Sequence, residues 1–247
     1  MSSEHLPYFF TDPELITEER VQIPSAEARH LSVRRAVPGD RIRVGDGSGT
    51  VVEARLEQIS AEGASAQVIS RSFEPPAATT LTVFQGLAKS GKVDWVVEKL
   101  VELGVDDVVV FSAGRSVPVW DEAKRERMLD RWRRVAAAAS KQSHRPRLPS
   151  VRGLLSSTQA VDEAAKLPLV LVGDPDASRN LRKVLAGPQP AQVGVVVGPE
   201  GGLDTSELER FCRVGALPVG LGPQVLRTET AALAICSVLL FQLGRLG

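Results

Sequence analysis

Hydrophobic and polar residues follow two different patterns along the chain, and the change falls near residue 73. Before it, apolar and polar positions mostly alternate, which is typical of half-buried strands joined by turns. This alternation predicts strands at Tyr8–Phe10, Arg41–Val44, Val51–Ile59 and Ala64–Arg71, a hairpin turn at Gly45–Gly49, and a short helix at Ser25–Val33. We therefore predict a small β-rich domain over residues 1–73.

After the linker Glu74–Ala78, short apolar runs alternate with amphipathic ones. The runs predict strands at Leu81–Gln85, Val108–Phe111, Leu169–Val172, Val193–Val197 and Leu217–Val219, and helices at Val93–Leu103, at Asp121–Ala139 and after Asp204. Strands that alternate with helices indicate a mostly parallel sheet covered on both faces. Residues 74–247 are thus predicted to form an α/β domain, with ligands beyond the carboxyl ends of its strands.

The segment Leu221–Ala232 carries polar groups into an apolar run that continues to Leu243. It predicts a loop that leads into a helix buried on most sides, with Thr228 or Thr230 capping the helix and Glu229 near the positive end of its dipole. Arg227 just before a buried helix is an unusual place for a charge. An ordinary loop with a surface arginine is the alternative interpretation.

A second loop, Gly198–Gly202, follows a predicted strand, and Asp204 with Glu207 forms a capping box behind it. It lacks the dinucleotide fingerprint, and Glu200 would repel a pyrophosphate. The loop therefore suits a cationic ligand such as S-adenosylmethionine. Gly86–Val93 matches most of a P-loop, but Val93 has no oxygen for magnesium, so nucleotide hydrolysis is disfavoured. Lys89 and Lys92 can still meet a phosphate.

The formal net charge is zero, yet basic residues are concentrated in two places. Arg115–Arg152 holds eleven Arg or Lys against four acids, which indicates an anionic partner such as RNA. A second group lies near the N-terminus: Arg29, His30, Arg34, Arg35, Arg41 and Arg43. This second group is either a solvated face or a contact for a phosphate backbone.

Cysteine content and apolar runs bear on the compartment. Cys212 and Cys236 fit neither a disulfide framework nor a metal site, and we expect two reduced core thiols. The chain shows no secretory signal and no apolar run long enough for a bilayer, so we expect a cytoplasmic protein without a membrane segment.

The loop Gly198–Gly202 together with Leu221–Gly222 and Val225–Ala231 resembles the knotted SPOUT-class methyltransferases. The closest resemblance is to the family that methylates N3 of a uridine in 16S ribosomal RNA. Matching pieces run through nearly the whole chain in the family's order: Arg29–Leu31, Gly39–Asp40, Asp46–Gly47, Glu98–Lys99, Glu102–Val105 and Arg115–Val117.

The resemblance implies a PUA-like RNA-binding barrel followed by a SPOUT domain with a trefoil knot, one of the rare exceptions to unknotted chains. It also implies a homodimer, S-adenosylmethionine as cofactor, no metal, and the small ribosomal subunit as partner. The residues implied to bind the cofactor are Gly173, Gly198, Pro199, Glu200, Gly201, Gly202, Leu221, Gly222, Leu226, Thr228, Thr230 and Ala231. The residues expected to bind RNA are Arg29, His30, Arg34, Arg35, Lys89, Lys92, Arg115 and Arg145.

Uridine N3 must lose its proton to become a nucleophile, and this requirement suggests catalytic roles. We hypothesise that Arg227 stabilises the negative charge that develops on the uracil oxygens. Glu200 or Glu229 can accept the proton, or both can be structural. Two departures from the family lie in or beside the basic segment: Gly114 and Lys141 each replace a common Glu, which puts in doubt any role for an acid there.

Two alternatives remain open. A SPOUT ribose 2′-O-methyltransferase would share the knot, although the N-terminal barrel and Arg227–Thr230 favour the base enzyme. A non-catalytic RNA-binding assembly factor would bind no cofactor, and the intact glycine-rich loops argue against it.

Overall fold

The computed structural model describes residues 6–89, 91–115, 120–179, 181–185, 187 and 190–246, without the side chains of Ser32 and Lys183. The chain forms two compact units. The N-terminal unit comprises Met1–Pro76 and Ser140–Leu148, and the C-terminal unit comprises Ala77–Ala139 and Pro149–Gly247. The chain therefore passes between the units three times. The return of Ser140–Leu148 to the first unit was not predicted from the sequence.

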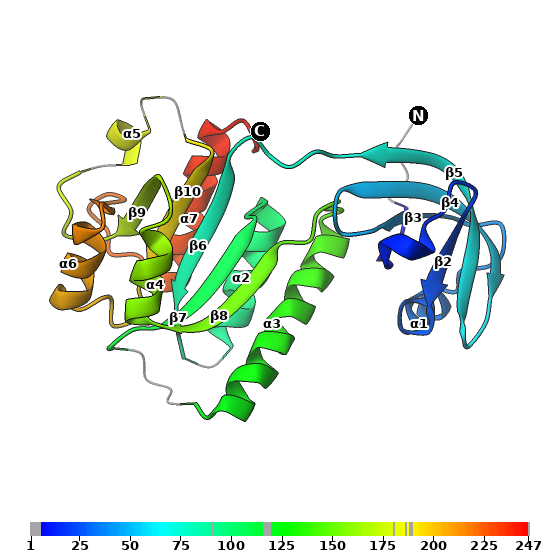
Figure 1. Ribbon diagram of the computed structural model, residues 1–247, viewed down its shortest axis with the longest axis horizontal. Coiled ribbons are helices and arrows are strands. Elements are labelled where there is room, and N and C mark those ends of the chain that lie inside the picture. The colour runs from blue at the N-terminus through cyan, green and yellow to red at the C-terminus, as the bar shows by residue number, and fades with distance from the viewer. Residues whose placement is uncertain are drawn as a thin grey trace. The chain divides into compact units, whose positions relative to one another are not determined.

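A curled mixed sheet forms the N-terminal unit, with strand order β1-β3-β4-β5-β2 (Figure 1). Its elements are β1 (Tyr8–Phe10), a 3₁₀ turn (Pro13–Leu15), β2 (Arg20–Pro24), α1 (Ser25–Val33), β3 (Arg41–Gly45), β4 (Thr50–Ile59) and β5 (Gly63–Phe73). β1 pairs in parallel with β3, and the other pairs are antiparallel. The predicted hairpin is confirmed, whereas β2 was missed.

The segment Ser140–Leu148 is bound to the β3–β4 turn by backbone hydrogen bonds. Gly49 N–H donates to Pro146 O at 3.2 Å, and Leu148 N–H donates to Gly47 O at 2.9 Å. Lys141 Nζ lies 2.5 Å from Glu27 Oε1 on α1. Because a glutamate at position 141 would place like charges together here, the Lys141 departure fits its local surroundings.

Six parallel strands form the sheet of the C-terminal unit, in the order β11-β9-β10-β6-β7-β8. The strands are β6 (Thr80–Gly86), β7 (Asp107–Ser112), β8 (Ser150–Ser156), β9 (Leu169–Gly173), β10 (Gln192–Val197) and β11 (Leu217–Val219). The helices are α2 (Lys92–Leu103), α3 (Glu122–Gln142), α4 (Ser157–Ala164), α5 (Leu181–Val184), α6 (Thr205–Arg213) and α7 (Thr228–Gln242). This confirms the α/β prediction, although β8 and α4 were missed.

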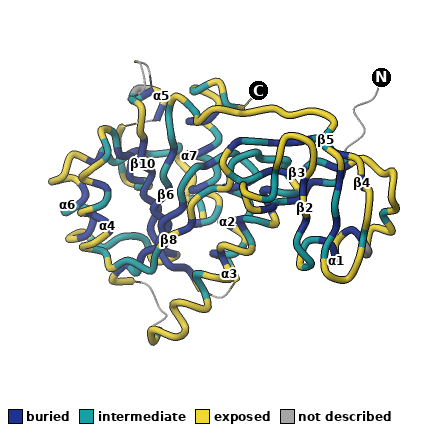
Figure 2. Tube along the Cα trace, turned by 45° about the vertical axis from the view of Figure 1, so that its right-hand side comes forward, coloured by how far each residue is buried: buried dark blue, intermediate teal, exposed yellow. Residues whose placement is uncertain are grey.

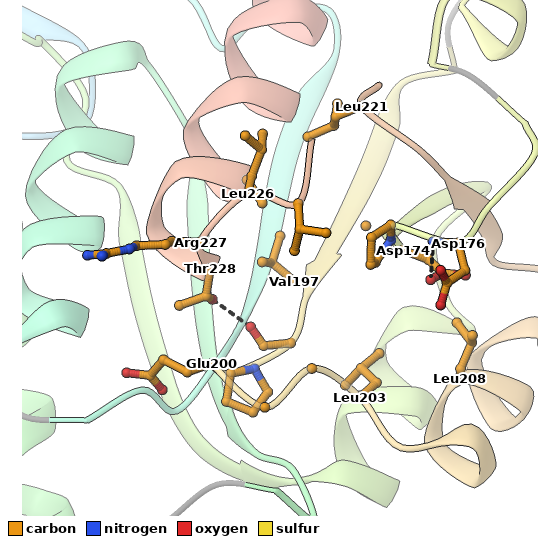
Figure 3. A pocket seen from close by; sticks show the side chains of 18 of the residues that line it. Asp174, Asp176, Val197, Glu200, Leu203, Leu208, Leu221, Leu226, Arg227 and Thr228 are labelled. Carbon is orange, nitrogen blue, oxygen red and sulfur yellow. Dashed lines mark hydrogen bonds between the residues drawn. The ribbon is translucent and has the colours of Figure 1, made fainter. Parts of the chain in front are cut away.

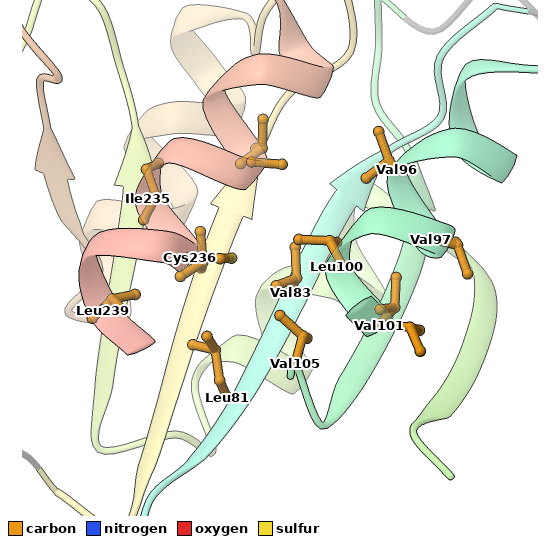
Figure 4. Packing of buried hydrophobic residues seen from close by; sticks show 14 of the residues in the cluster. Leu81, Val83, Val96, Val97, Leu100, Val101, Val105, Ile235, Cys236 and Leu239 are labelled. Carbon is orange, nitrogen blue, oxygen red and sulfur yellow. The ribbon is translucent and has the colours of Figure 1, made fainter. Parts of the chain in front are cut away.

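Each face of this sheet is covered by its own hydrophobic core, because strand side chains alternate between faces. On one face, Val83 and Val195 pack against α2 and α7. Leu100 on α2 and Ile235 on α7 belong to this core (Figure 4). On the other, Phe84 and its neighbours meet α4 and α6. The strands β6 and β10 at the centre are mostly buried (Figure 2).

Local signals for helix ends were predicted well. Gly104 ends α2 in the left-handed region with φ 108°, and its N–H donates to Leu100 O. Asp204 and Glu207 form the predicted capping box at the start of α6.

One expectation about burial is wrong. Cys212 is exposed on α6, and only Cys236 is a core thiol. The helix α7 is buried on most sides, as predicted, and its remaining face carries Val238, which is 45% exposed, and Phe241, which is 68% exposed. The error at Cys212 arises because composition shows that a segment is apolar but not which neighbours cover it.

Candidate functional site

A cavity of about 530 Å³ lies at the carboxyl ends of β9, β10 and β11. Three loops form its wall, and they are the loops after these three strands. The lining residues are Lys92, Arg115, Gly173, Asp174, Pro175, Asp176, Val197, Gly198, Pro199, Glu200, Gly201, Gly202, Leu203, Leu208, Val219, Leu221, Gly222, Gln224, Val225, Leu226, Arg227, Thr228 and Ala231. The volume is in the range of small-molecule sites.

Glycines are required where these loops approach other backbone. A Cβ on Gly198 would lie 2.8 Å from Leu203 N, and a Cβ on Gly86 would lie 2.5 Å from Pro199 N. Neither position can therefore carry a side chain without a shift of the backbone. The end of β6 thus packs directly beneath the β10–α6 loop.

Charged groups gather at two ends of the cavity, with apolar residues between them (Figure 3). Asp174 and Asp176 stand at one end, and Arg227 and Glu200 stand at the other. The wall includes three acids and three bases in all, which are Asp174, Asp176, Glu200, Lys92, Arg115 and Arg227. A ligand that combines an apolar ring system with groups of both charges fits such a wall better than a polyphosphate does.

Lys92 joins two carboxylates that the sequence offered as proton acceptors. Its Nζ lies 3.2 Å from Glu200 Oε1 and 3.5 Å from Glu229 Oε2. Glu200 also accepts the backbone N–H of Lys89 at 3.1 Å. Partial burial acts to raise the pKa of Glu200, but backbone donors and Lys92 outweigh it and hold this pKa below its ordinary value.

The predicted capping role of Thr228 and Thr230 is wrong. The N-cap of α7 is Arg227, and neither threonine side chain caps the helix. The Thr228 hydroxyl instead donates to Gly198 O at 2.5 Å and accepts from Gln85 Nε2 at 2.9 Å. Thr228 therefore connects the helix to the β10–α6 loop and to β6.

The cavity brings together nearly all residues predicted to bind the cofactor. Thr230 is the exception, because it is exposed on α7 and does not line the cavity. Of the predicted catalytic residues, Arg227 and Glu200 are on the wall, whereas Glu229 is not.

The residues predicted to bind RNA are divided between the two units. Lys92 and Arg115 line the cavity, and Arg115 donates to Gly201 O at 2.8 Å. Lys89 is exposed on the loop after β6. The remaining five are in the N-terminal unit: Arg29, His30, Arg34 and Arg35 are exposed, and Arg145 is half-buried. Ser116 and Val117, which contribute to the family resemblance, lie outside the described residues.

Sequence reasoning left several residues in or near the site without a role. The loop that holds Asp174 and Asp176 follows a predicted strand, at the edge where ligands were expected, but neither acid was assigned to the site. Gln85 is entirely buried, and no local pattern marks it. Gly114 N–H donates to the buried Glu207, and a Cβ on Gly114 would lie 3.0 Å from Asp204 Oδ2.

Within the described part of the chain, no group of His, Cys, Asp or Glu is arranged to hold a metal ion. In the same residues, no helix is long and apolar enough to cross a membrane.

The lining of the cavity can be compared with the chemistry of a cofactor. The apolar centre of the wall, its carboxylates and its tight backbone turns fit S-adenosylmethionine, which carries an adenine, two hydroxyls, an ammonium, a carboxylate and a sulfonium.

Comparison with known proteins agrees with this geometry. The model of an RNA methyltransferase domain matches residues 75–240, and that of an RNA methyltransferase PUA domain matches residues 23–69. The chain is 38% identical to ribosomal RNA small subunit methyltransferase E of Mycobacterium bovis over 91% of this chain and 87% of that protein. It is 30% identical to the Bacillus subtilis protein of the same name, over 89% of each chain.

A solved structure extends the comparison to three dimensions. The Neisseria gonorrhoeae ribosomal RNA small subunit methyltransferase E, bound to S-adenosyl methionine, matches with a TM-score of 0.86 and 28% identity, over 96% of this chain and 98% of that one. The family model, the relatives and the fold all agree. This chain belongs to the S-adenosylmethionine-dependent RNA methyltransferase family represented by ribosomal RNA small subunit methyltransferase E.

Proposed function

We propose that this protein transfers the methyl group of S-adenosylmethionine to N3 of one uridine in 16S ribosomal RNA, the uridine numbered 1498 in the family's substrate. One observation carries the proposal. The loops Gly198–Gly202 and Leu221–Thr228 meet at one cavity, and Arg227 lies on its wall. The names of the relatives support a ribosomal RNA of the small subunit as the substrate.

The cofactor is assigned to the cavity between these loops. Backbone groups of Gly173, Gly198, Gly201, Leu221, Gly222 and Leu226 are proposed to bind it, with Pro199, Glu200, Gly202, Thr228 and Ala231 completing the wall. When bound, the cofactor supplies a methyl group on a positively charged sulfur, which is the electrophile. Thr230 is no longer assigned here, because it does not line the cavity.

Arg227 is proposed to act on the uracil. Loss of the N3 proton leaves negative charge on the two ring oxygens, and a guanidinium beside them stabilises that charge. Arg227 suits this role because its side chain is exposed at the end of the wall, next to the half-buried Leu226. Its backbone position is fixed because it is the N-cap of α7.

The two carboxylates are better described as anchors than as bases. Lys92 pairs with both, and Glu200 is further bound by the Lys89 N–H. The lowered pKa of Glu200 makes it a weak proton acceptor. We therefore assign Glu200 and Glu229 to holding the loop and the helix in place, and Arg227 to the charge of the uracil.

RNA is proposed to contact both units, with residues 1–73 as the RNA-binding domain and 74–247 as the catalytic one. Exposed Arg29, Arg34 and Arg35 lie on and just after α1, where a phosphate backbone can reach them. Arg127 and Arg134 are exposed on α3. Because an assembled subunit presents 16S RNA in a fixed shape, we propose the small subunit rather than free RNA as the substrate.

A homodimer is proposed from the uncovered face of α7. Val238 and Phe241 are exposed there, and Trp95 on the neighbouring α2 is 43% exposed. Large apolar side chains exposed on two packed helices are typical of subunit interfaces. From the family to which the chain belongs, we further propose that the C-terminal chain end passes through a trefoil knot. The cytoplasm is the proposed compartment, because the substrate is found there.

A methyl-transfer assay tests the proposal. Purified protein is incubated with S-adenosylmethionine labelled in the methyl group and with small ribosomal subunits from a strain that lacks this activity. Digestion of the RNA to nucleosides should place the label in 3-methyluridine. Label in a ribose would identify a 2′-O-methyltransferase instead. Absence of cofactor binding by calorimetry would identify an RNA-binding assembly factor.

A further inference from the structure

Gln85 is a fully buried polar residue at the centre of the C-terminal unit. It stands one residue before the end of β6 and is 0% exposed. Burying an amide is unfavourable unless its groups find partners, and an apolar residue of similar size would avoid that cost. An amide at this position therefore requires an explanation from its hydrogen bonds.

The NH₂ group of Gln85 has two acceptors. Nε2 donates to Gly86 O at 3.0 Å and to Thr228 Oγ1 at 2.9 Å. The orientation of the amide is fixed because Gly86 O can only accept. Its carbonyl oxygen, Oε1, is buried and has no hydrogen-bond partner among the described residues. The two hydrogen bonds donated by Nε2 therefore explain the amide at this position, whereas its carbonyl oxygen does not.

Thr228 continues this chain of hydrogen bonds. Its hydroxyl has one proton, and since it accepts from Gln85, it directs that proton to Gly198 O at 2.5 Å. The three residues come from β6, from the β10–α6 loop and from the first position of α7. The network therefore connects segments that are far apart in the sequence.

These connections set the spacing of the cavity wall. Gly198 and Pro199 line it from the β10–α6 loop, and Leu226 and Arg227, directly before Thr228, line it from the loop that leads into α7. Gly86 packs against Pro199 without room for a side chain, so β6 forms a fixed base for both.

We propose that Gln85 and Thr228 are positioning residues, which hold the Gly198 loop and the Arg227 loop at one fixed distance and so preorganise the cavity for the cofactor. This inference rests on the proposed function, because it assumes that the two loops bind S-adenosylmethionine. A preformed cavity binds more tightly because the loops lose less freedom on binding.

Substitutions test the network through cofactor affinity as well as activity. Thr228→Val removes the hydroxyl with little change in shape, and we expect the affinity for S-adenosylhomocysteine to fall about 10-fold, the equivalent of one hydrogen bond. Thr228→Ser keeps the hydroxyl and should bind within about 3-fold of the original protein. Isothermal titration calorimetry measures both.

A double variant separates positioning from stability. Gln85→Met with Thr228→Val removes the donor and the acceptor together, so it leaves fewer unpaired groups than Thr228→Val alone. Compared with Thr228→Val, we expect the double variant to recover resistance to denaturant, while its affinity for S-adenosylhomocysteine and its kcat stay low. If stability, affinity and kcat all recover together, the role is purely structural and the inference is overturned. Unchanged affinity in Thr228→Val would do the same.

Two controls complete the experiment. Thr11, 8% exposed in the N-terminal unit, donates its hydroxyl to Gln22 O at 2.8 Å, so Thr11→Val deletes a similar hydrogen bond far from the cavity in sequence. It should leave calorimetric affinity unchanged. If the wild-type protein binds S-adenosylhomocysteine but methylates no uridine, only the proposed function is contradicted, and the affinities of the variants still test the positioning role. If the wild-type protein does not bind S-adenosylhomocysteine, the proposed function and the positioning role are both overturned.

Discussion

The two ends of the parallel sheet in the C-terminal unit are closed in different ways. At the amino end, Arg245 forms two bonds to the carboxylate of Asp106, at 2.7 and 2.9 Å, and two more to the carbonyls of Gly104 and Thr79. At the carboxyl end, a cavity is left open, and among the bonds that join its loops are those of the Thr228 hydroxyl and the Gln85 amide.

The helix α7 takes part in both ends. It begins at Thr228 beside the cavity and ends at Gln242, three residues before Arg245. Its centre is anchored in the core by Ile235 and Leu239, which are fully buried. The difference between the ends lies in how each arginine is held. Arg245 at the amino end makes four hydrogen bonds, whereas the Arg227 side chain at the carboxyl end is exposed and can contact a substrate.

The largest effect is expected at the open end. Arg227→Ala should lower kcat by about 10² to 10³-fold, because it removes the charge that stabilises the uracil oxygens in the transition state. Affinity for S-adenosylhomocysteine should change by less than about 3-fold, since this interaction is not made with the cofactor. Single-turnover methyl transfer and calorimetry measure the two quantities. Arg227→Lys, which keeps the charge without the planar fork, should be intermediate.

An equal loss of affinity and of kcat in Arg227→Ala would contradict this assignment. It would mean that Arg227 shapes the cofactor site rather than the chemistry.

The opposite result is expected at the closed end. Arg245→Ala removes the ion pair of the partly buried Asp106, which keeps only neutral donors such as the Leu81 N–H, and should lower the free energy of unfolding by about 2 kcal/mol. The rate of methyl transfer should not change. Unfolding in denaturant can be followed by fluorescence, because all three tryptophans are in the C-terminal unit: Trp95, Trp120 and Trp132.

Arg245→Lys is the matched control at this position. It keeps one charge and should recover part of the lost stability. A fall in kcat without a fall in stability would show that the two ends are not separable in the way the hydrogen bonds indicate.

A smaller effect is expected for Glu200, which stands at the open end but is bound like a structural group. Glu200→Gln should lower kcat by less than about 10-fold and leave the shape of its pH profile unchanged, because the amide still accepts the Lys89 N–H. Glu229→Gln is the companion variant, since it loses the same partner, Lys92. A loss above about 100-fold, together with loss of the acid limb of the profile, would identify Glu200 as the proton acceptor.

The same contrast explains what the sequence could predict. Helix ends depend on neighbours in the chain, so Gly104 and the pair of Asp204 and Glu207 were found correctly. The glycine loops after strands were found for a similar reason, because parallel strands place their carboxyl ends together. Most of the cavity wall could therefore be predicted before its geometry was known.

Long-range contacts were not predictable in this way. Thr228 is next to a helix start, and local rules assign it to a cap, yet a stronger tertiary partner at Gly198 takes its hydroxyl. Gln85 belongs to an apolar strand, and only the fold shows why its amide is there. The return of Ser140–Leu148 to the N-terminal unit likewise depends on the β3–β4 turn, which is about a hundred residues away in the chain.

The smallest effect concerns pH, and it sharpens the view of Glu200 as an anchor. The pKa of Glu200 is lowered from its ordinary value of 4.5 in the folded protein, so ionised Glu200 stabilises the fold at pH values above 4.5. This contribution is lost as the pH falls through the lower, folded pKa. At pH 7, the free energy of unfolding of the wild-type protein should therefore be higher than that of the Glu200→Gln variant. The difference should be less than about 1 kcal/mol, because the ion pair with Lys92 is partly exposed. The difference should vanish near the acid limit of the folded state. Denaturant titrations at pH 7 and in mild acid measure it, and a difference that grows with acid would mean that Glu200 is held in its protonated form.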